Sequence, residues 1–535
     1  MSRKLMLMML ILTSLTMIAL VSRIVFSQSL TCKQYSIPQP EPVDYVDANT
    51  GTWSVTFAEA VHNLDSGLNY TTIQGAIDAN ETDDGHTILV ESGTYYENVN
   101  ITKSISLIGE DRSTTIIYYV GTGAVINITK NNVNVTGFKI QSGWIAAGFY
   151  LNNANRCNIT GNIMAYNLYG VYLVRSFNNT ISRNTVTENH DVGISLNSSS
   201  ANDIFGNNIT NNEYGSGVYL FNSLENTISR NNITNNSIGV RLKDASNNNV
   251  SGNTVTDNWT GISLTSSFNN TISANTVTAN SGCGVSLGGS NNTVYGNTIA
   301  ANDDFGIYLP VSSNNIISGN DITNNYVNGI RLADTSSNRL YHNNIIDNVQ
   351  QVFIEYVGHG NLWDNNVEGN YWSNYDGTDA DNDGIGDSWC QIDENNIDHY
   401  PLMGMFSSFN TSLGYHVDVM SNSTLENFEY LESNGTIVIY LSGEGFGFCR
   451  VCISHDLMNE QYSVIINGTD VLPYHVDCEL YDNGTHRWIY FTYKHSILEV
   501  VIVPEFPSFL IPPIFMTATL LVAIIHRKRL LCDNN

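Results

Sequence analysis

The feature that most constrains the fold of this chain is a short repeat between residues 148 and about 345. One pattern returns there every 22 to 24 residues. Its most visible part is Gly-Φ-x-Leu, with Φ an apolar residue. This motif starts at Gly148, Gly170, Gly193, Gly217, Gly239, Gly261, Gly284, Gly306 and Gly329. A fixed period of this length is typical of a solenoid, in which each repeat stacks on the preceding one.

Each repeat contains two further short apolar signals. One column runs from Ile159 to Leu340 and the other from Met164 to Ile345, and corners rich in Asn, Gly and Ser separate them. Three short alternating segments per repeat predict three β-strands per turn, which is the arrangement of a parallel β-helix. A helical solenoid needs apolar spacings of three and four over a dozen residues, and the repeats lack them.

An Asn stands two residues before every member of the second apolar column. These residues are Asn162, Asn184, Asn207, Asn231, Asn253, Asn275, Asn297, Asn320 and Asn343. Asn tolerates left-handed backbone at a corner, and Asn side chains in register can hydrogen-bond along a stack. We therefore expect this column to be structural and not catalytic.

The outward position of Gly-Φ-x-Leu predicts a second column, on the surface. Alternation with a period of two places Val171 and Leu173 inside and Tyr172 outside. The outward column reads Tyr150, Tyr172, Ser195, Tyr219, Arg241, Ser263, Ser286, Tyr308 and Arg331. Its Tyr and Arg side chains could stack against an extended polysaccharide. The candidate carbohydrate-binding residues are thus Tyr150, Tyr172, Tyr219, Arg241, Tyr308 and Arg331. The alternative is that β-surfaces favour Tyr whatever their function.

Upstream of the repeat, Thr72–Ala79 predicts a short amphipathic helix that covers the open end of the solenoid. This cap and the Asn-x-Ile and Gly-Φ-x-Leu turns resemble the right-handed β-helix superfamily of pectate lyases, polygalacturonases and carbohydrate-binding or sugar-hydrolysis domains. The resemblance covers roughly residues 70–405 and is strongest to the NosD-type periplasmic copper-binding branch, especially its archaeal surface members. It implies an all-β, right-handed, single-stranded parallel β-helix (pectin-lyase-like) over residues 28–405.

The resemblance also raises enzymatic activity as a possibility. Polygalacturonase-like β-helices carry Asp-Asp, Gly-His-Gly and Arg-Φ-Lys motifs on neighbouring turns. Here the matching fragments are Asp303-Asp304, Gly358-His-Gly360 and Arg241-Leu-Lys243, in a different chain order and at least two turns apart. With about 4.8 Å between turns they cannot meet at one glycosidic bond. We expect no catalysis, with a polysaccharide lyase or glycoside hydrolase as the alternative.

Copper handling, the function in the name of the NosD-type branch, would need clustered His, Met or Cys side chains. The repeats offer only isolated candidates, such as His190 and His342. We therefore expect no copper.

An acidic loop follows the repeats and predicts a calcium site. Asp379, Asp381 and Asp383 alternate, Gly384 permits a sharp turn, and Asp387 comes next. Carboxylates in this spacing suit a hard cation that prefers oxygen ligands, although Cys390 stands where an EF-hand has its bidentate Glu. Asp393 or Glu394 would have to complete the ligand set. The alternative is an acidic surface loop without an ion.

Residues 406–503 lose the repeat and predict a small antiparallel β-sandwich. Strand-like runs such as Thr436–Leu441, Tyr462–Ile466 and Trp488–Tyr493 lie between Asn-Gly turns.

The two ends of the chain predict export and anchoring. Residues 1–27 read as a signal peptide, or alternatively as an uncleaved anchor. Residues 504–529 combine an apolar stretch with a basic tail and predict a transmembrane helix that holds the chain at the outer cell surface. The tripeptide Pro504-Glu-Phe506 resembles archaeal sorting signals that a sortase-like peptidase cleaves. Permanent anchoring is equally compatible.

The charge of the chain limits its partners. It has 50 acidic and 22 basic residues, a formal net charge of −28 and, as expected for an exported glycoprotein, 20 Asn-x-Ser/Thr sequons. Such a surface repels phosphate backbones, so we expect no nucleic-acid partner. The sequence predicts a cell-surface-anchored β-helix protein that binds a polysaccharide or cell-envelope glycan without catalysis. A rigid envelope spacer or adhesin is a further alternative.

Overall fold

The computed structural model describes residues 43–46, 53–56, 59–355, 360–458, 462–467, 469–470, 479–494 and 498–504. The predicted signal peptide, and the predicted C-terminal segment from residue 505 on, lie outside these residues. No helix among the described residues has the length and apolar character needed to cross a membrane. The chain divides into two units, residues 1–58 and 59–535. In the first unit β1 (Val43–Val46) pairs antiparallel with β2 (Trp53–Thr56).

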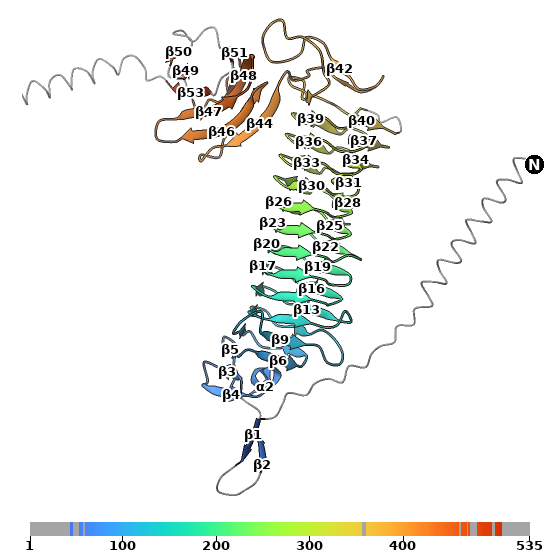
Figure 1. Cartoon of the computed structure of the whole chain (residues 1–535), viewed down its shortest axis with the longest axis vertical. Coiled ribbons are helices and arrows are strands. Elements are labelled where there is room, and N and C mark those ends of the chain that lie inside the picture. Colours follow the sequence, from blue (N-terminus) through green and yellow to red (C-terminus); the bar gives the residue numbers. More distant parts are fainter. Residues whose placement is uncertain are drawn as a thin grey trace, which may run out of the picture. The chain divides into compact units, whose positions relative to one another are not determined.

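The repeat region forms a parallel β-helix, as predicted, because each turn adds one strand to each of three sheets (Figure 1). In the described residues the first sheet has 12 strands: β7 (Val99–Ile101), β10 (Ile126–Ile128), β13 (Ala147–Asn152), β16 (Tyr169–Val174), β19 (Val192–Asn197), β22 (Ser216–Phe221), β25 (Ile238–Lys243), β28 (Thr260–Phe268), β31 (Val285–Ser290), β34 (Phe305–Pro310), β37 (Asn328–Ala333) and β40 (Gln350–Ile354).

The second sheet, counted over the described part of the chain, has 14 strands: β4 (Leu68–Tyr70), β3 (Val61–Asn63), β5 (Thr87–Val90), β8 (Ser106–Gly109), β11 (Asn134–Thr136), β14 (Asn158–Thr160), β17 (Thr180–Ser182), β20 (Asp203–Phe205), β23 (Thr227–Ser229), β26 (Asn249–Ser251), β29 (Thr271–Ser273), β32 (Thr293–Tyr295), β35 (Ile316–Ser318) and β38 (Arg339–Tyr341).

The third sheet has 13 strands within the residues described: β6 (Gly93–Tyr96), β9 (Thr115–Tyr118), β12 (Lys139–Gln141), β15 (Ile163–Ala165), β18 (Thr185–Thr187), β21 (Asn208–Thr210), β24 (Asn232–Thr234), β27 (Thr254–Thr256), β30 (Thr276–Thr278), β33 (Thr298–Ala300), β36 (Asp321–Thr323), β39 (Asn344–Ile346) and β41 (Tyr371–Trp372).

One apolar core fills the space between the three sheets. Val171 and Leu173 are fully buried, as the alternation predicts, and the core runs without a break from Val61 to Trp372. The predicted cap is α2 (Ile73–Asp78), whose Ile73, Ala76 and Ile77 are buried. Thr72 is its N-cap, with Oγ1 accepting from the backbone N–H of Gly75.

The predicted Asn column forms a continuous hydrogen-bonded ladder. In one turn Asn184 Nδ2 donates to Asn207 Oδ1 at 3.0 Å and to the carbonyl of Ile159 at 2.8 Å. One detail of the prediction is wrong: the left-handed residue is the one before each ladder Asn, such as Arg183 with φ 55°. This left-handed turn leaves the amide of the ladder Asn buried and aligned with the next turn.

Sequence reasoning missed two further Asn ladders of the same kind. One follows the third sheet and the other precedes the second sheet. Their members, buried like those of the first ladder, are Asn167, Asn189, Asn212, Asn236, Asn258, Asn280, Asn302, Asn325 and Asn348, and Asn179, Asn202, Asn226, Asn248, Asn270, Asn292, Asn315, Asn338 and Asn361. A buried ladder at each corner satisfies the polar groups of a turn that no water reaches.

A carboxylate closes the first ladder at the C-terminal end of the solenoid. Asp398, in the hairpin of β42 (Cys390–Gln391) and β43 (Ile397–Asp398), is fully buried. Its Oδ2 accepts from the backbone N–H of Asn370 and from Trp372 Nε1, both at 2.8 Å.

The remaining strands form two antiparallel sheets, each with five strands in the described residues. One contains β44 (Met405–Asn410), β45 (His416–Ser421), β48 (Phe446–Ser454), β52 (His486–Lys494) and β51 (Glu479–Asp482); the other contains β46 (Thr424–Leu431), β47 (Thr436–Ser442), β53 (Leu498–Pro504), β49 (Tyr462–Ile466) and β50 (Thr469–Asp470). Val419, Ile439 and Val500 belong to one shared core. Two sheets that share a core form a β-sandwich, as predicted.

Candidate functional site

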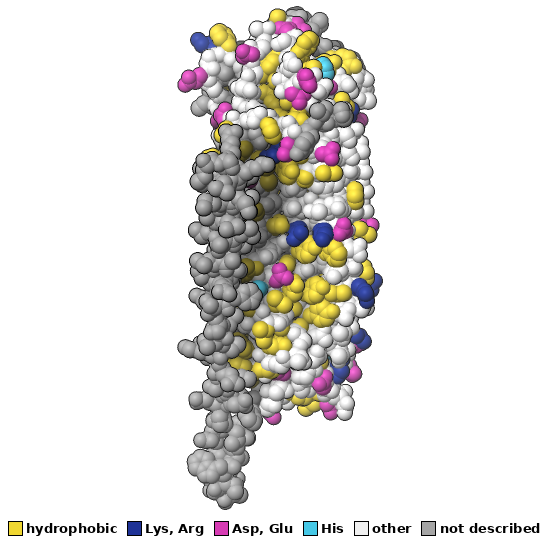
Figure 2. Space-filling view, turned by 90° about the vertical axis from the view of Figure 1, so that its right-hand side faces the viewer, with side chains coloured by type: hydrophobic (Ala, Val, Ile, Leu, Met, Phe, Trp, Pro, Cys, Tyr) yellow, Lys and Arg dark blue, Asp and Glu magenta, His cyan; other side chains and the backbone are white. Residues whose placement is uncertain are grey.

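The outward column that the repeat predicts exists in the structure, in unbroken register on the first sheet. Tyr150 pairs with Tyr172, Tyr172 with Ser195, Ser195 with Tyr219 and Tyr219 with Arg241. Ser263, Ser286, Tyr308 and Arg331 continue the column. Figure 2 views the side on which the first-sheet strands are labelled in Figure 1, and hydrophobic side chains gather there with basic side chains beside them.

A cleft of about 210 Å³ opens in this column where Ser195 stands between two tyrosines. Tyr172 and Tyr219 lie on strands either side of β19, so their backbones are about 10 Å apart. Ser195 is only 5% exposed and forms the floor. A small residue between two aromatic residues thus creates a hollow with an aromatic wall on each side.

Neighbouring side chains hold both aromatic walls in place. Tyr169 stacks on Tyr172, with ring centroids 5.0 Å apart, and the Arg241 guanidinium lies 5.3 Å from the Tyr219 ring centroid. Burial and a hydrogen bond to Asp191 raise the pKa of Tyr169 to about 12, so this phenol keeps its proton and shares it with the Asp191 carboxylate. The cleft therefore combines aromatic faces with a carboxylate, a guanidinium and hydroxyls, which is a suitable set for a polyhydroxylated ligand.

Two residues of the cleft, Asp191 and Tyr214, come from corner loops that sequence reasoning missed. The spacing between the ladder Asn and the Gly of Gly-Φ-x-Leu varies along the repeat. It is three residues after Asn167, Asn236 and Asn258, and four from Asn189 to Gly193 and in three later repeats. From Asn212 to Gly217 it reaches five. Insertions in a solenoid map to loops on one face, so the longer spacing was the available signal. Gly215 lets the loops meet, since a Cβ there would lie 1.8 Å from the Asp191 carbonyl oxygen.

The other predicted binding residues are arranged differently. Tyr150 stands next to Tyr172 with ring centroids 5.6 Å apart, and Ser263 and Ser286 separate this group from Tyr308 and Arg331. Arg331 pairs with Glu355 at 2.8 Å, and its guanidinium lies over the rings of three side chains: Phe305, Tyr308 and Phe353. Arg331 is thus already engaged within the protein, whereas Tyr172, Tyr219 and Arg241 surround the cleft.

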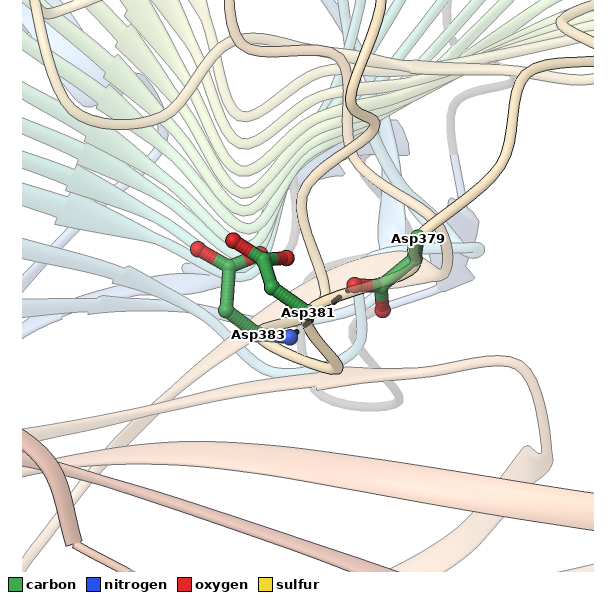
Figure 3. Close-up of side chains that lie close together, drawn as sticks. All are labelled: Asp379, Asp381 and Asp383. Carbon is green, nitrogen blue, oxygen red and sulfur yellow. Dashed lines mark hydrogen bonds between the residues drawn. The ribbon is translucent and has the colours of Figure 1, made fainter.

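The structure brings together three of the four predicted calcium ligands. Potential ligand atoms of Asp379, Asp381 and Asp383 lie within 4.8 Å of one another, and Figure 3 shows the carboxylates of Asp381 and Asp383 side by side. Asp379 accepts from the backbone N–H groups of Asp383 and Gly384, at 3.0 and 2.9 Å. Burial raises the pKa of Asp383, and the negative charges of Asp381 and Asp379 raise it further by a smaller amount.

The fourth predicted ligand, Asp387, lies outside this group of three. Its Oδ2 accepts from the backbone N–H of Ala380 at 2.9 Å and from the Thr378 hydroxyl at 3.0 Å. Asp393, one of the two residues expected to complete the shell, is bonded instead to Asn395 and Asn396. The three clustered carboxylates fit a calcium ion whose remaining ligands are carbonyls or water.

Two family profiles match the chain. The profile described as "Right handed beta helix region" matches residues 77–216 and 122–277, and "Periplasmic copper-binding protein (NosD)" matches residues 235–377. A "Cell surface glycoprotein" of Methanothermus fervidus is 39% identical over 106 residues, which is 20% of this chain and 17% of that protein.

Among solved structures, the Dettilon tailspike protein (gp208) is 14% identical, with a TM-score of 0.45 over 78% of this chain and 86% of that one. The A-module of the Azotobacter vinelandii mannuronan C-5 epimerase AlgE4 is 18% identical, with a TM-score of 0.43 over 54% of this chain and 94% of that one.

Proposed function

We propose, from the premise that this chain belongs to the right-handed parallel β-helix superfamily, that it is a cell-surface protein that binds polysaccharide without chemical turnover. The observation that carries this proposal is the cleft over Ser195 between Tyr172 and Tyr219. Sugar rings present apolar faces that stack on aromatic side chains, and their hydroxyls bond to groups such as Asp191 and Arg241.

Both the comparisons and the sequence support a location at the cell surface. The matching segment of the Methanothermus fervidus relative belongs to a cell surface glycoprotein, and one profile describes periplasmic proteins. The sequence predicts a signal peptide and a C-terminal anchor, and the 20 sequons suit an exported chain. Anchoring and glycosylation are parts of the proposal.

The separation of the candidate catalytic motifs favours binding over turnover. Arg241 lies on β25, and Asp304 comes just before β34, three strands further along the first sheet. At about 4.8 Å per strand, these groups lie too far apart to act on one glycosidic bond. Copper is not part of the proposal, because the two histidines lie many turns apart and each is engaged elsewhere. His190 stacks on Tyr214, and His342 is bonded to Glu368.

A calcium ion held by Asp379, Asp381 and Asp383 is the second part of the proposal. The loop lies beyond the last repeats and away from the Ser195 cleft in sequence, so we assign the ion a stabilising role. Asp387 contributes by fixing the backbone of the loop through Ala380.

The test is binding of the purified full chain to a panel of neutral and acidic polysaccharides. We expect Tyr172→Ala and Tyr219→Ala to weaken binding about tenfold each, because a stacked aromatic ring contributes about 1 to 1.5 kcal/mol. The matched control is Tyr295→Ala, an exposed tyrosine on β32 of the second sheet. Equal affinity of all four proteins, or binding of none of the glycans, would favour the rigid spacer or adhesin instead. Cleavage products in the same mixtures would favour the lyase or hydrolase.

A further inference from the structure

A second hollow lies beside the Ser195 cleft and shares one wall with it. This acidic groove, of about 610 Å³, is lined by Trp144, Glu188, Asn189, His190, Asn211, Glu213 and Tyr214. Tyr214 lines both hollows. A chain of sugar units that fills the cleft would therefore enter the acidic groove with its next units.

The aromatic walls of the groove are fixed in position. Trp144 has a left-handed backbone (φ 68°), and its indole Nε1 donates to the carbonyl of Glu188, two turns away, at 3.0 Å. On the other wall, His190 stacks on Tyr214 with ring centroids 5.0 Å apart. Even so, Trp144 is 52% and Tyr214 75% exposed. Large rings that are held rigidly and left open to solvent are suited to contact a ligand.

The charge of the groove has one sign. Its lining includes Glu188 and Glu213, and among the described residues that line it there is no lysine or arginine. A hydrogen bond from Tyr166 orients the Glu188 carboxylate and raises the pKa of the Tyr166 phenol. Two carboxylates that line one groove with an indole and a phenol favour a protonated amine, which gains both ionic and cation–π attraction.

We propose that the acidic groove recognises an amine-bearing sugar unit of the polysaccharide held in the Ser195 cleft. This inference rests on the proposed function and names the chemical class of one unit of the ligand. A neutral or N-acetylated sugar would contact the same rings but would leave the two carboxylates without a cation.

The experiment compares two oligosaccharides of equal length and linkage, the hexamers of glucosamine and of N-acetylglucosamine. Binding to the full chain is measured at low ionic strength and near-neutral pH. We expect the glucosamine hexamer to bind about five- to tenfold more tightly, and added salt to reduce this preference. In the Glu188→Gln/Glu213→Gln double variant the preference should disappear, while affinity for the N-acetylated hexamer stays unchanged.

The main control addresses the negative charge of the whole protein, which attracts any cation. Glu225→Gln removes a charge from an exposed residue that follows β22, at the corner leading to the second sheet, and should leave the preference intact. Equal affinity for the two hexamers, or a preference that survives in the double variant, would overturn the inference. The Tyr172→Ala variant tests the Ser195 cleft and not the acidic groove, and it should lose binding of both hexamers. Failure of the proposed function can therefore be distinguished from failure of the present inference.

Discussion

Arg450 in β48 of the sandwich lies 2.7 Å from the carboxylate of Glu368 at the end of the solenoid, and both side chains are about nine-tenths buried. Glu368 also accepts from His342 Nε2 at 2.8 Å, while Arg450 donates to the Asp383 carbonyl at 2.6 Å. Burial acts to raise the pKa of Glu368, but the His342 hydrogen bond and the Arg450 charge outweigh it and hold the pKa below its usual value. A buried charge network thus connects the solenoid, the acidic loop and the sandwich.

Removing one partner of this pair should destabilise the protein strongly. Arg450→Met leaves Glu368 buried without its cation, and we expect a loss of about 3 to 5 kcal/mol in the free energy of unfolding. Denaturant-induced unfolding of the full chain measures it. The exposed Arg112 offers a control, Arg112→Met, which should change little. If Glu368→Gln/Arg450→Met is no more stable than Arg450→Met alone, the unpaired charge is not the cause.

Asp398 should make stability fall as the pH rises from about 4 to 6. Burial raises its pKa to about 6, against the hydrogen bonds from Trp372 and Asn370, which lower it. The folded state therefore holds a proton that the unfolded state has already lost in this window. The contribution of Asp398 to the free energy of unfolding is fully present below the pKa of the unfolded state. It is lost as the pH rises through 6, and the total loss is about 3 kcal/mol.

Unfolding free energies measured at several pH values test the role of Asp398. The Asp398→Asn variant cannot titrate there, so its stability should depend less steeply on pH between 4 and 6. Parallel curves for the variant and the parent protein would contradict the assignment. The variant should also be less stable at low pH, because an amide cannot accept from Asn370, Trp372 and Tyr400 together.

A buried ladder asparagine should contribute far more to the stability of the protein than an exposed asparagine of the same turn. Asn253 is buried, and its Nδ2 donates to Asn275 Oδ1 at 3.0 Å and to the Ile228 carbonyl at 2.8 Å. Asn253→Ala leaves these buried acceptors and the N–H groups of Asn231 short of partners, so we expect a loss of about 3 kcal/mol. Asn249→Ala, an exposed position on β26, is the comparison and should lose less than about 0.5 kcal/mol. Thermal and denaturant unfolding would both detect the difference.

Calcium should raise the melting temperature through the acidic loop. At a concentration about 100 times its Kd, one ion stabilises by about 2.7 kcal/mol. Asp381 is exposed, so Asp381→Asn should reduce the calcium effect while leaving the stability of the calcium-free protein unchanged. Asp347→Asn, at a corner of the third sheet, removes an equal charge elsewhere. A calcium-induced shift of the same size in both variants would count against the site.

Filling the floor of the cleft should abolish glycan binding without unfolding the protein. Ser195→Tyr extends the run of outward tyrosines and occupies the hollow between Tyr172 and Tyr219, so affinity should fall at least about tenfold. Ser263→Tyr makes the same change in the same column, beyond Arg241, and should bind normally. Titration with the best glycan of the panel compares them. Normal binding by Ser195→Tyr would place the ligand elsewhere.

Much of the fold followed from the sequence because it depends on local patterns. The fixed period predicted the turns, the alternation of Val171, Tyr172 and Leu173 predicted their faces, and together they predicted the register of the outward column. The cap helix after Thr72 and the strands between Asn-Gly turns were equally readable. These features need only neighbouring residues and one repeated geometry.

The binding surface was only partly readable, because it depends on contacts between turns. The sequence placed Tyr172, Tyr219 and Arg241 in one column and predicted Arg331 as a binding residue as well. Only the structure shows that Arg331 is paired with Glu355. Asp191 and Tyr214 reach the cleft through longer corner loops, whose paths depend on close packing at Gly215.

The sequence by itself determined that this protein is a solenoid of stacked β-strands with a polar corner column and an outward row of tyrosines, because a repeat forces every turn into the same geometry. Tertiary structure alone decided where that row becomes a cleft, which aspartates meet in the acidic loop and how Glu368 is neutralised by Arg450. The cleft and the pair of Glu368 and Arg450 bring together side chains far apart in the chain, so their distances follow from packing and not from local spacing. In the acidic loop, hydrogen bonds that Asp379 and Asp387 accept from the backbone decide which aspartates meet.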